Sequence, residues 1–388
     1  MPDLVALALP DAALLPALDA VWAAGDAALP VPPDLPAEAR GRLLAALRPA
    51  RVHTAEGSTA CPDPEPVADG TALVIPTSGS TGEPKGVVLS SAAMAASNRA
   101  CLARIGAAPG ERWLCCLPLH HVAGLQVVQR SRALGCEPLL VPGFDTAAVA
   151  SALRAGEVVH VSLVPTQLVR LLDAGAPLDA CRTVLLGGAP ASAALRERAR
   201  KAGVPLVTTY GMTETSGGCV YDGVALDGVE VSIEPDGVVR IAGPVLFDGY
   251  RLRPDLTAAA LDSHGLRTAD LGRLSSDGRL QVLGRADDVI ISGGRKVGAA
   301  EVVALLTAHP GVAEAAVFPQ PDADWGQRVV AAVVPADPGS PPDLAALRAH
   351  VRASAPAWMA PRELLVVPSL PRSALGKVDL GALRRRLG

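Results

Sequence analysis

The chain has 388 residues, a hydrophobic content of 49% and a net charge of −4. This length suggests two domains, and the weak negative charge disfavours a nucleic-acid-binding protein, which carries a basic footprint. We expect no membrane span, because no apolar stretch is long enough, and the N-terminus lacks the basic start of a signal peptide. The seven cysteines, an odd number without a C-x-x-C pair, suit a reducing cytoplasm and give no zinc site.

Along the chain, residues 1–70 are expected to form helices and loops, with proline-rich breaks at 30–36 and 61–66. From residue 72 to about 220, short apolar runs alternate with amphipathic stretches, which predicts a largely parallel sheet flanked by helices. The predicted strands are residues 72–75, 86–89, 113–117, 138–141, 158–164, 184–186 and 205–208. The predicted helices between them are residues 147–155, 166–173 and 192–202.

Residues 77–86, T-S-G-S-T-G-E-P-K-G, are the most informative segment of the chain. They hold three glycines, four hydroxyl side chains and one lysine between two predicted strands. Glycine permits close backbone approach to a ligand, while hydroxyls, exposed N–H groups and a lysine can surround an anion. A Ser/Gly-rich surface hairpin is the plainer interpretation. The flanking apolar strands favour a phosphate-binding turn, although G-x-x-x-x-G-K-[ST] cannot be laid onto it.

The pattern changes after residue 223. Short predicted strands at 229–233, 238–241 and 280–282 are separated by Asp-Gly turns at 227, 236 and 277, which indicates a small, mostly antiparallel element. A β/α unit follows residues 284–288. Its predicted helices are 297–308 and 344–354, and its predicted strands are 312–318 and 329–334. This unit is a candidate small domain.

Further segments carry more chemistry than packing requires. Residues 210–215, Y-G-M-T-E-T, follow a strand at the end where α/β folds bind ligands. Asp270 precedes a turn, G-R-A-D-D at 284–288 lies near Gly293 and Gly294, and P-R-S-A-L-G-K ends at Lys377. In this order the segments resemble the adenylate-forming superfamily of acyl- and aryl-CoA ligases, luciferases and peptide-synthetase adenylation domains. The resemblance covers nearly the whole chain and is weakest before residue 65.

Residues 163–168, 185–190 and 209–223 resemble, more narrowly, bacterial o-succinylbenzoate–CoA ligases of menaquinone biosynthesis. The resemblance implies an α/β fold with two domains. Residues 1–285 would form a large N-terminal domain, with mainly parallel sheets flanked by helices plus a small β subdomain. Residues 286–388 would form a small, mobile α+β C-terminal domain.

The resemblance also implies a cytoplasmic, ATP-dependent, AMP-forming acid–thiol ligase. A carboxylate attacks the α-phosphorus of ATP, and the thiol of coenzyme A (CoA) then displaces AMP. Several residues match the implied ATP contacts: Thr77, Ser78, Gly79, Ser80, Thr81, Gly82 and Lys85 at the phosphates, Tyr210 and Gly211 at adenine, Asp270 at the ribose, and Arg285 at the ribose or a phosphate. Glu214 would hold Mg2+, Thr213 would assist at the α-phosphate, and Lys377 would stabilise charge there.

The remaining roles concern the acid, CoA and domain movement. By resemblance Asp287 is the hinge, and Gly293 and Gly294 approach the pantetheine of CoA. His121 would lie near the substrate carboxylate, although a structural histidine is almost as good an interpretation. Gly187, Gly188 and Thr209 would line the acyl pocket. The candidates for a second substrate carboxylate are Arg130, Arg132 and Ser216, and none of them is assigned.

The chain departs from the family pattern in two places. Residues 265–270, G-L-R-T-A-D, lack the usual aromatic residue and T-G-D. Residues 293–296 are G-G-R-K where relatives carry G-G-E-N, which adds two positive charges that would meet CoA phosphates or stay solvated. Three alternatives stay open: another acid–CoA ligase, an adenylation module that loads a carrier protein, and a non-catalytic nucleotide-binding relative. A homodimer is also left open.

Overall fold

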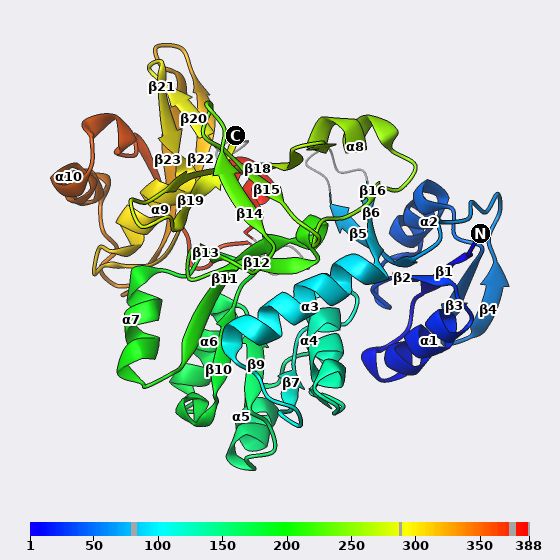
Figure 1. The fold of residues 1–388 in the computed structure, drawn as a ribbon. Coiled ribbons are helices and arrows are strands. Elements are labelled where there is room, and N and C mark those ends of the chain that lie inside the picture. Colours follow the sequence, from blue (N-terminus) through cyan, green and yellow to red (C-terminus); the bar gives the residue numbers. More distant parts are fainter. Residues whose placement is uncertain (79–83, 287–288, 372–377, 387–388) are drawn as a thin grey trace. The chain divides into compact units, whose positions relative to one another are not determined.

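The computed structural model describes residues 1–78, 84–286, 289–371 and 378–386 (Figure 1). Its internal contacts divide the chain into two compact units. Unit 1 comprises Met1–Pro190, Arg198–Ser232 and Arg240–Arg267, and unit 2 comprises Ala191–Glu197, Ile233–Val239 and Thr268–Gly388. The domain boundary expected between residues 285 and 286 stays a prediction.

The first sheet of unit 1 has the strand order β16–β6–β5–β2–β1–β3–β4. Its strands are β1 (Leu4–Leu7), β2 (Ala27–Pro30), β3 (Arg51–Thr54), β4 (Gly57–Ala60), β5 (Thr71–Ser78), β6 (Pro84–Ser90) and β16 (Gly249–Tyr250). β1 runs parallel to β2 and β3, and β2 runs parallel to β5. The pairs β3–β4, β5–β6 and β6–β16 are antiparallel.

The expectation that residues 1–70 hold only helices and loops is wrong, because β1 to β4 lie there. Every residue of β1 and β2 is buried. A strand that is covered on both faces shows no alternation of apolar and polar residues, so a four-residue apolar run has no readable period. Pairing with segments elsewhere in the chain, rather than local pattern, determines β1 and β2.

The second sheet of unit 1 has the order β13–β12–β11–β10–β9–β7–β8. Its strands are β7 (Trp113–Cys115), β8 (Leu139–Leu140), β9 (His160–Leu163), β10 (Thr183–Leu186), β11 (Leu206–Met212), β12 (Gly217–Tyr221) and β13 (Val224–Ala225). From β8 to β11 every neighbouring pair is parallel, whereas β11–β12 and β12–β13 are antiparallel. The predicted α/β architecture with mainly parallel strands is confirmed.

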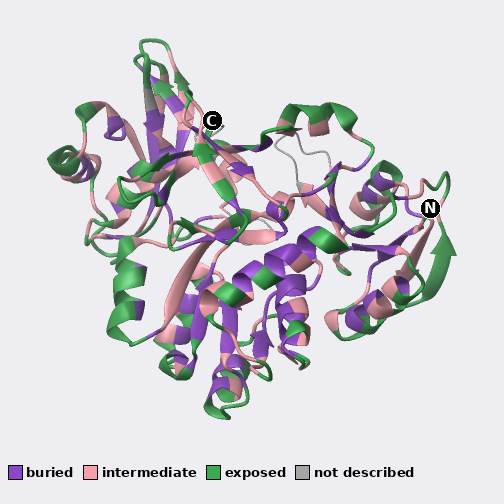
Figure 2. Cartoon of the chain, viewed as in Figure 1, coloured by how far each residue is buried: buried purple, intermediate pink, exposed green. Residues whose placement is uncertain are grey.

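Helices cover these sheets (Figure 1). In unit 1 they are α1 (Asp11–Ala23), α2 (Ala37–Leu47), α3 (Ser91–Ile105), α4 (Val122–Ala133), α5 (Thr146–Arg154), α6 (Pro165–Asp173) and α8 (Pro254–Ala260). α7 (Ala193–Lys201) is divided between the units. Figure 2 shows a buried face on α3 and on α4, and α3 contacts both β5 and β6 of the first sheet and β12 of the second.

Local sequence explains where α3 begins and ends. The hydroxyl of Ser90 accepts a hydrogen bond from Ala93 N at 3.3 Å, which is an N-cap of about 1 kcal/mol. Gly106 ends the helix with φ +61°, the left-handed conformation that favours glycine. Small residues dominate its buried face, so the helix can pack closely against both sheets. α3 therefore joins the two sheets of unit 1.

A third sheet has the order β14–β15–β18–β17, with β19 paired to β18. Its strands are β14 (Glu230–Ile233), β15 (Val238–Ala242), β17 (Leu261–Asp262), β18 (Gly265–Leu274) and β19 (Leu280–Arg285). The three predicted Asp-Gly turns are confirmed, because Gly228, Gly237 and Gly278 have φ values of +79°, +88° and +79°. Glycine adopts this backbone without the steric cost that a Cβ imposes.

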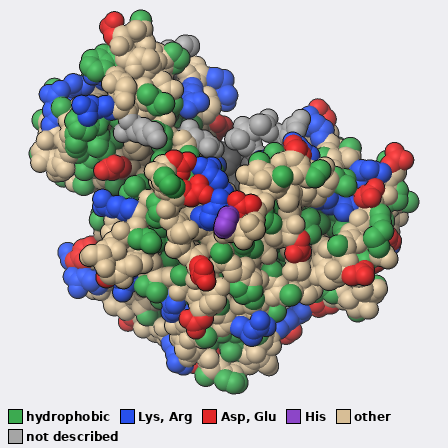
Figure 3. All heavy atoms as spheres, turned by 45° about the horizontal axis from the view of Figure 1, so that its top comes forward, with side chains coloured by type: hydrophobic (Ala, Val, Ile, Leu, Met, Phe, Trp, Pro, Cys, Tyr) green, Lys and Arg blue, Asp and Glu red, His purple; other side chains and the backbone are tan. Residues whose placement is uncertain are grey.

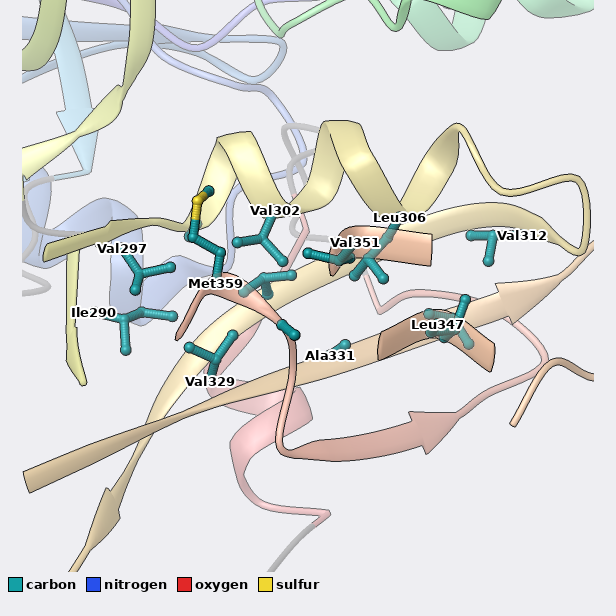
Figure 4. Close-up of a cluster of buried hydrophobic side chains, with 14 residues drawn as sticks. Ile290, Val297, Val302, Leu306, Val312, Val329, Ala331, Leu347, Val351 and Met359 are labelled. Atoms are coloured by element: carbon teal, nitrogen blue, oxygen red, sulfur yellow. The ribbon is translucent and has the colours of Figure 1, made fainter. Parts of the chain in front are cut away.

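Unit 2 has its own sheet, with the order β21–β20–β23–β22 and β24 parallel to β23. Its strands are β20 (Val289–Ser292), β21 (Arg295–Gly298), β22 (Val312–Asp322), β23 (Gly326–Pro335) and β24 (Glu363–Val366), and its helices are α9 (Ala299–Thr307), α10 (Leu344–Ser354) and α11 (Leu380–Arg384). Figure 4 shows the core that α9 and α10 form with this sheet, including Val302, Leu306, Val329, Leu347 and Val351. The predicted α+β character of this region is confirmed.

Candidate active site

The glycine-rich segment lies between two antiparallel strands, as predicted. β5 ends at Ser78 and β6 begins at Pro84, and Thr77 is the register partner of Lys85. This pairing places Thr77 and Lys85 together at the base of the turn. Gly79, Ser80, Thr81 and Gly82 lie outside the described residues, as does the side chain of Ser78. Their predicted phosphate contacts stay predictions.

The segment at 210–215 continues β11 and then turns into a short 3-10 helix, Thr213–Thr215. Tyr210 and Gly211 belong to β11, while Thr213 and Glu214 belong to the turn. A Cβ at Gly211 would lie 2.1 Å from Gly217 O, so only glycine allows β12 to approach this closely. The hydroxyl of Thr215 fastens the turn through a 2.9 Å bond from Met212 N and a 2.7 Å bond to Gly217 O.

Glu214 and Lys85 both contact Tyr250, Glu214 at its hydroxyl and Lys85 at its ring. The hydroxyl of Tyr250 donates a hydrogen bond to Glu214 Oε1 at 2.8 Å, and Lys85 Nζ lies 5.5 Å from the centre of the same ring. The structure therefore brings a predicted phosphate ligand and a predicted metal ligand to one aromatic residue. Sequence reasoning missed Tyr250. The available signal was its rarity, because the chain has only three tyrosines.

The predicted pocket residues Gly187 and Thr209 are neighbours. Gly187 follows β10, and Thr209 lies in β11 alongside. Thr209 Oγ1 donates to Leu186 O at 3.3 Å and lies 2.5 Å from where a Cβ at Gly187 would stand. Gly188 has φ +79°, with Val164 Cγ1 3.2 Å from its ideal Cβ position. Glycine at both positions therefore lets Thr209 and Val164 approach the backbone at the carboxyl end of β10.

His121 is the N-cap residue of α4, and its side chain makes no capping hydrogen bond. Its ring lies against that of His120, with centroids 4.4 Å apart. Gly124, in the first turn of α4, is needed because a Cβ there would lie 2.3 Å from Pro118 O. The close approach holds the start of α4 against the end of the preceding segment, which fixes where His121 lies.

Three residues were candidates for binding a second carboxylate, and the structure gives them different surroundings. Arg132 pairs with Asp19, with Nη1–Oδ1 and Nη2–Oδ2 distances of 2.6 and 2.9 Å, and with Glu137. The hydroxyl of Ser216 donates to Val245 O at 2.9 Å. Arg130 is different, because only 4% of it is exposed and its Nε has no hydrogen-bond partner. No carboxylate in the described part of the chain pairs with it.

The surroundings of Arg130 are aromatic and neutral. Its guanidinium lies over the ring of Trp113, 5.7 Å from the centroid. Tyr221 donates a hydrogen bond to Cys101 Sγ at 3.0 Å. Burial raises the pKa of Tyr221, and the nearby Arg130 only partly opposes this shift, so the phenol is uncharged at neutral pH. A buried guanidinium ordinarily has an anionic partner, and the described residues supply none.

In unit 2, Asp270 and Arg285 face each other across β18 and β19 as register partners. Arg285 Nη1 lies 3.9 Å from Asp270 Oδ1, and the Asp270 side chain is only 14% exposed. Thr268 supports the aspartate, since its hydroxyl accepts from Asp270 N at 3.1 Å and donates to Val239 O at 2.7 Å. Asp270, predicted at the ribose, and Arg285, predicted at the ribose or a phosphate, are therefore brought together.

Gly293 and Gly294 form the turn between β20 and β21, with φ values of +57° and +72°. A Cβ at Gly293 would lie 2.6 Å from Trp325 Cε3. Trp325 is 39% exposed, and the Arg362 guanidinium stacks 3.6 Å from its ring centre. Arg295 stacks likewise over Trp358 at 4.4 Å. The predicted hinge Asp287 and catalytic Lys377 lie outside the described residues.

A hollow of about 600 Å³ elsewhere in unit 1 is not this site. It is lined by Trp22, Thr71, Asn98 and Arg99 among others, so it opens at the first residue of β5. The glycine-rich turn follows the last residue of the same strand.

On the face drawn in Figure 3, acidic and basic side chains are interspersed. Among the described residues, no helix combines the length and apolar character needed to cross a membrane.

Comparison with known proteins places the chain in a family. A model of AMP-binding enzymes matches residues 44–253, and a model of the AMP-binding enzyme C-terminal domain matches residues 301–377. The chain belongs to the AMP-binding enzyme family. Both matched regions hold predicted site residues, among them Glu214 and Lys377.

Named relatives narrow the comparison. A probable 2-succinylbenzoate–CoA ligase of Mycobacterium tuberculosis is 43% identical, covering 97% of this chain and 95% of its own length. The o-succinylbenzoate CoA synthetase of Bacillus subtilis, solved with its acyl-adenylate intermediate, is 30% identical with a TM-score of 0.87, covering 99% of this chain and 88% of its own. ATP-bound MatB of Rhodopseudomonas palustris is 25% identical with a TM-score of 0.88, covering 100% and 89%.

Proposed function

We propose that this protein is an ATP-dependent, AMP-forming acid–CoA ligase whose acid is o-succinylbenzoate, as in menaquinone biosynthesis. The reaction class is supported by family membership and by Lys85 and Glu214 meeting at Tyr250 beside the glycine-rich turn. The identity of the acid is supported by the relative that is 43% identical over nearly the full chain. The observation that carries the acid's identity in the structure is the buried, unpaired guanidinium of Arg130.

The proposed chemistry has two steps. A carboxylate oxygen of the acid attacks the α-phosphorus, and the bond to the β-phosphate oxygen breaks, which gives acyl-adenylate and pyrophosphate. The sulfur of CoA then attacks the acyl carbon, AMP leaves with its electron pair, and the thiol proton is released. We assign the phosphates to Thr77 and Lys85, adenine to Tyr210, and the ribose to Asp270 with Arg285. Lys377 would stabilise charge at the α-phosphate.

Glu214 fits the metal that this chemistry uses. Mg2+ binds proteins through one or two carboxylates and completes its shell with substrate phosphates and water. Glu214 receives a hydrogen bond on Oε1 and makes no ion pair with any described residue. The described residues contain no cluster of three or more His, Cys, Asp or Glu side chains that would form an all-protein cage. Bound there, Mg2+ would neutralise phosphate charge, as a single-carboxylate site allows.

We assign Arg130 to the second carboxylate of o-succinylbenzoate. Tyr221, which neighbours Arg130, is the register partner of Thr209. A Cβ at Gly218 would lie 3.0 Å from the Tyr221 ring and 3.2 Å from Thr209 Cβ, so these groups are contiguous. Tyr221 therefore links the pocket residue Thr209 to the cation of Arg130. A dicarboxylic acid can provide the missing counter-charge, whereas benzoate cannot once its one carboxylate is adenylated.

The test of function measures acid-dependent exchange of pyrophosphate into ATP, and CoA-thioester formation, with o-succinylbenzoate, benzoate and fatty acids. We expect both activities to be highest with o-succinylbenzoate. No activity with that acid would reject the proposed substrate, and exchange without CoA-thioester formation would favour an adenylation module that loads a carrier protein.

A charge-removing variant tests Arg130 separately. Arg130→Met should raise the KM for o-succinylbenzoate roughly tenfold or more, the value of one charge-assisted hydrogen bond, without changing the rate with benzoate. Stability should not fall, because an unpaired buried charge is replaced by an apolar side chain. The matched control is Arg132→Met in the same helix, whose guanidinium is already paired with Asp19 and Glu137. Equal losses with both acids would contradict the assignment.

We further propose a cytoplasmic location. All seven cysteines are free thiols, which suits a reducing compartment, and both ATP and CoA are available there. A homodimer and the absence of nucleic-acid partners stay predictions, which light scattering and a nucleic-acid binding assay would check.

A further inference from the structure

Tyr250 contacts two oppositely charged side chains with two different parts of its own. Its hydroxyl donates to Glu214 Oε1 at 2.8 Å, and its ring lies 5.5 Å from Lys85 Nζ. A phenol hydroxyl is a hydrogen-bond donor that matches a carboxylate, and the face of an aromatic ring attracts a cation. Tyr250 therefore gives each charged side chain a favourable contact that does not involve the other.

The backbone around Tyr250 is held from several directions. β16 pairs with β6, with Tyr250 opposite Val87 and Gly249 opposite Val88. Tyr250 N donates to Thr257 Oγ1 at 2.8 Å. Gly249 has φ +138°, and a Cβ there would lie 2.8 Å from Thr257 Cγ2. Tyr250 therefore has its position set by β6, the same strand that carries Lys85.

Glu214 is tied to the same support. Phe247 N donates to Glu214 O at 2.9 Å, and the Phe247 ring packs edge-on against Tyr250, with centroids 4.9 Å apart and an interplanar angle of 67°. These contacts hold together the turn that carries Glu214, the strand that carries Lys85 and the short strand that carries Tyr250. All of these residues belong to unit 1.

The physical consequence concerns the site before nucleotide binds. A carboxylate and an ammonium near each other attract, and an ion pair between them would have to break before either could meet phosphate or metal. Among the described residues, no ion pair of Glu214 or Lys85 is found. Tyr250 offers each charge another partner, its hydroxyl to Glu214 and its ring to Lys85. Such preorganisation lowers the free energy of binding, since fewer groups have to rearrange.

We propose that Tyr250 is a positioning residue that orients Glu214 toward the metal of a metal–ATP complex and keeps Lys85 apart from it. This inference rests on the proposed use of ATP and Mg2+ by the same site. It assigns no chemical step to Tyr250, which would act only through the two charged residues.

The test uses the full-length protein, the α,β-methylene analogue of ATP, which resists cleavage at the reacting bond, and Mn2+ as a paramagnetic probe. Mn2+ binding to protein saturated with the analogue is followed by electron paramagnetic resonance, and analogue binding in EDTA is followed by calorimetry. Tyr250→Phe keeps the ring and removes the hydroxyl, whereas Tyr250→Leu removes both. Tyr221→Phe is the matched control, because it also removes a tyrosine hydroxyl, the one bonded to Cys101.

We expect Tyr250→Phe to raise the Kd for Mn2+ about tenfold, the value of one hydrogen bond to a charged group, without changing the Kd for the analogue in EDTA. Tyr250→Leu should raise both constants, because Lys85 is then able to pair with Glu214. Tyr221→Phe should change neither.

Two results would overturn the role of Tyr250: an unchanged Mn2+ affinity in Tyr250→Phe, or equal losses of Mn2+ and analogue affinity, which a general structural defect predicts. If the wild-type protein failed to bind the analogue at all, the proposed function would fall, and this role with it. Normal analogue binding with unaltered Mn2+ affinity in the variant would remove the role of Tyr250 alone.

Discussion

Thr209 Oγ1 occupies the space that a side chain at Gly187 would need, 2.5 Å from the ideal Cβ position. The two residues belong to neighbouring parallel segments, so a change at one must displace the other. In Gly187→Ala we expect the displaced hydroxyl to intrude on the acyl pocket. The KM for the acid in pyrophosphate exchange should rise while the KM for ATP stays the same, and stability should fall by about 1–3 kcal/mol from overpacking.

A second substitution makes this prediction specific. Thr209→Ala in the Gly187→Ala background removes the colliding hydroxyl and should restore stability. Gly41→Ala is the control, because a Cβ at this helical position meets nothing within 4 Å and should stabilise α2 by up to about 1 kcal/mol. An unaltered KM for the acid in Gly187→Ala would argue against a pocket at this place.

The role of Asp270 at the ribose can be tested by changing the sugar of the nucleotide. If its carboxylate accepts hydrogen bonds from the ribose hydroxyls, Asp270→Ala should raise the KM for ATP roughly 10- to 100-fold, as loss of a charge-assisted hydrogen bond predicts. With 2′-deoxyATP the increase should be smaller, because one of the lost bonds is already missing. Equal increases with both nucleotides would mean that Asp270 acts only through its ion pair with Arg285.

Gly293 gives a test of the CoA step that leaves adenylation untouched. Alanine at this position would adopt a left-handed backbone at a cost of about 1–2 kcal/mol and would also collide with Trp325. We expect Gly293→Ala to slow CoA-thioester formation without slowing pyrophosphate exchange. Gly294→Ala has the same backbone strain but nothing within 4 Å of its Cβ, so a larger effect at Gly293 isolates the role of Trp325. Loss of pyrophosphate exchange in Gly293→Ala would instead place this turn in the first step.

Lys377 lies outside the described residues, and its role is predicted from sequence. Lys377→Ala should reduce pyrophosphate exchange by orders of magnitude, because charge at the α-phosphate is no longer stabilised. Thioester formation from premade acyl-adenylate and CoA should largely survive. Equal loss of the two activities would show that the lysine is not confined to the adenylation step.

The free energy of unfolding should depend on pH because of His160. Its Nε2 lies 3.0 Å from Glu111 Oε2, and Nδ1 is buried without a partner, so the neutral ring carries its proton on Nε2 and donates to the carboxylate. Burial lowers the pKa of His160, although Glu111 opposes this. Burial alone would raise the pKa of Glu111, but hydrogen bonds from Ala108 N, His160 and Arg182 hold it below its usual value.

The sign follows from these two directions. Below about pH 6.5, the ordinary pKa of histidine, the unfolded chain binds a proton that the folded His160 refuses, so folding stability is lost as pH falls. The slope from one such group is at most about 1.4 kcal/mol per pH unit. Glu111 adds a further loss only below its own unfolded pKa of about 4.3.

Urea denaturation at pH 7.5 and 5.5, followed by tryptophan fluorescence, checks this prediction. His160→Gln can keep a hydrogen bond to Glu111 but cannot titrate, so it should flatten the dependence in this window. His264→Gln, at an exposed position, should leave it unchanged. The same pH dependence in wild type and His160→Gln would show that other groups dominate.

Local pattern was sufficient for much of this protein. Strands β7 to β11 of the second sheet, the helices at 166–173 and 344–354 and the Asp-Gly turns follow from periodicity and turn chemistry, which depend on near neighbours, whereas β12 and β13 were not predicted. The glycine-rich hairpin between β5 and β6 and the order of the family segments also follow from the sequence, because each motif is a continuous stretch. These features determine the fold class and the reaction class.

Tertiary structure decided what depends on segments distant along the chain. β1 and β2 are buried strands that pair with segments elsewhere in the chain, and Tyr250 gains its place from pairing with β6, far from it in sequence. Arg130 and Arg132 look alike in the sequence, yet one is buried without a counter-charge and the other is paired at the surface. The sequence by itself determined which residue types are present and in what order. Only packing decided which charges are paired, because burial and partner choice depend on residues that folding brings together.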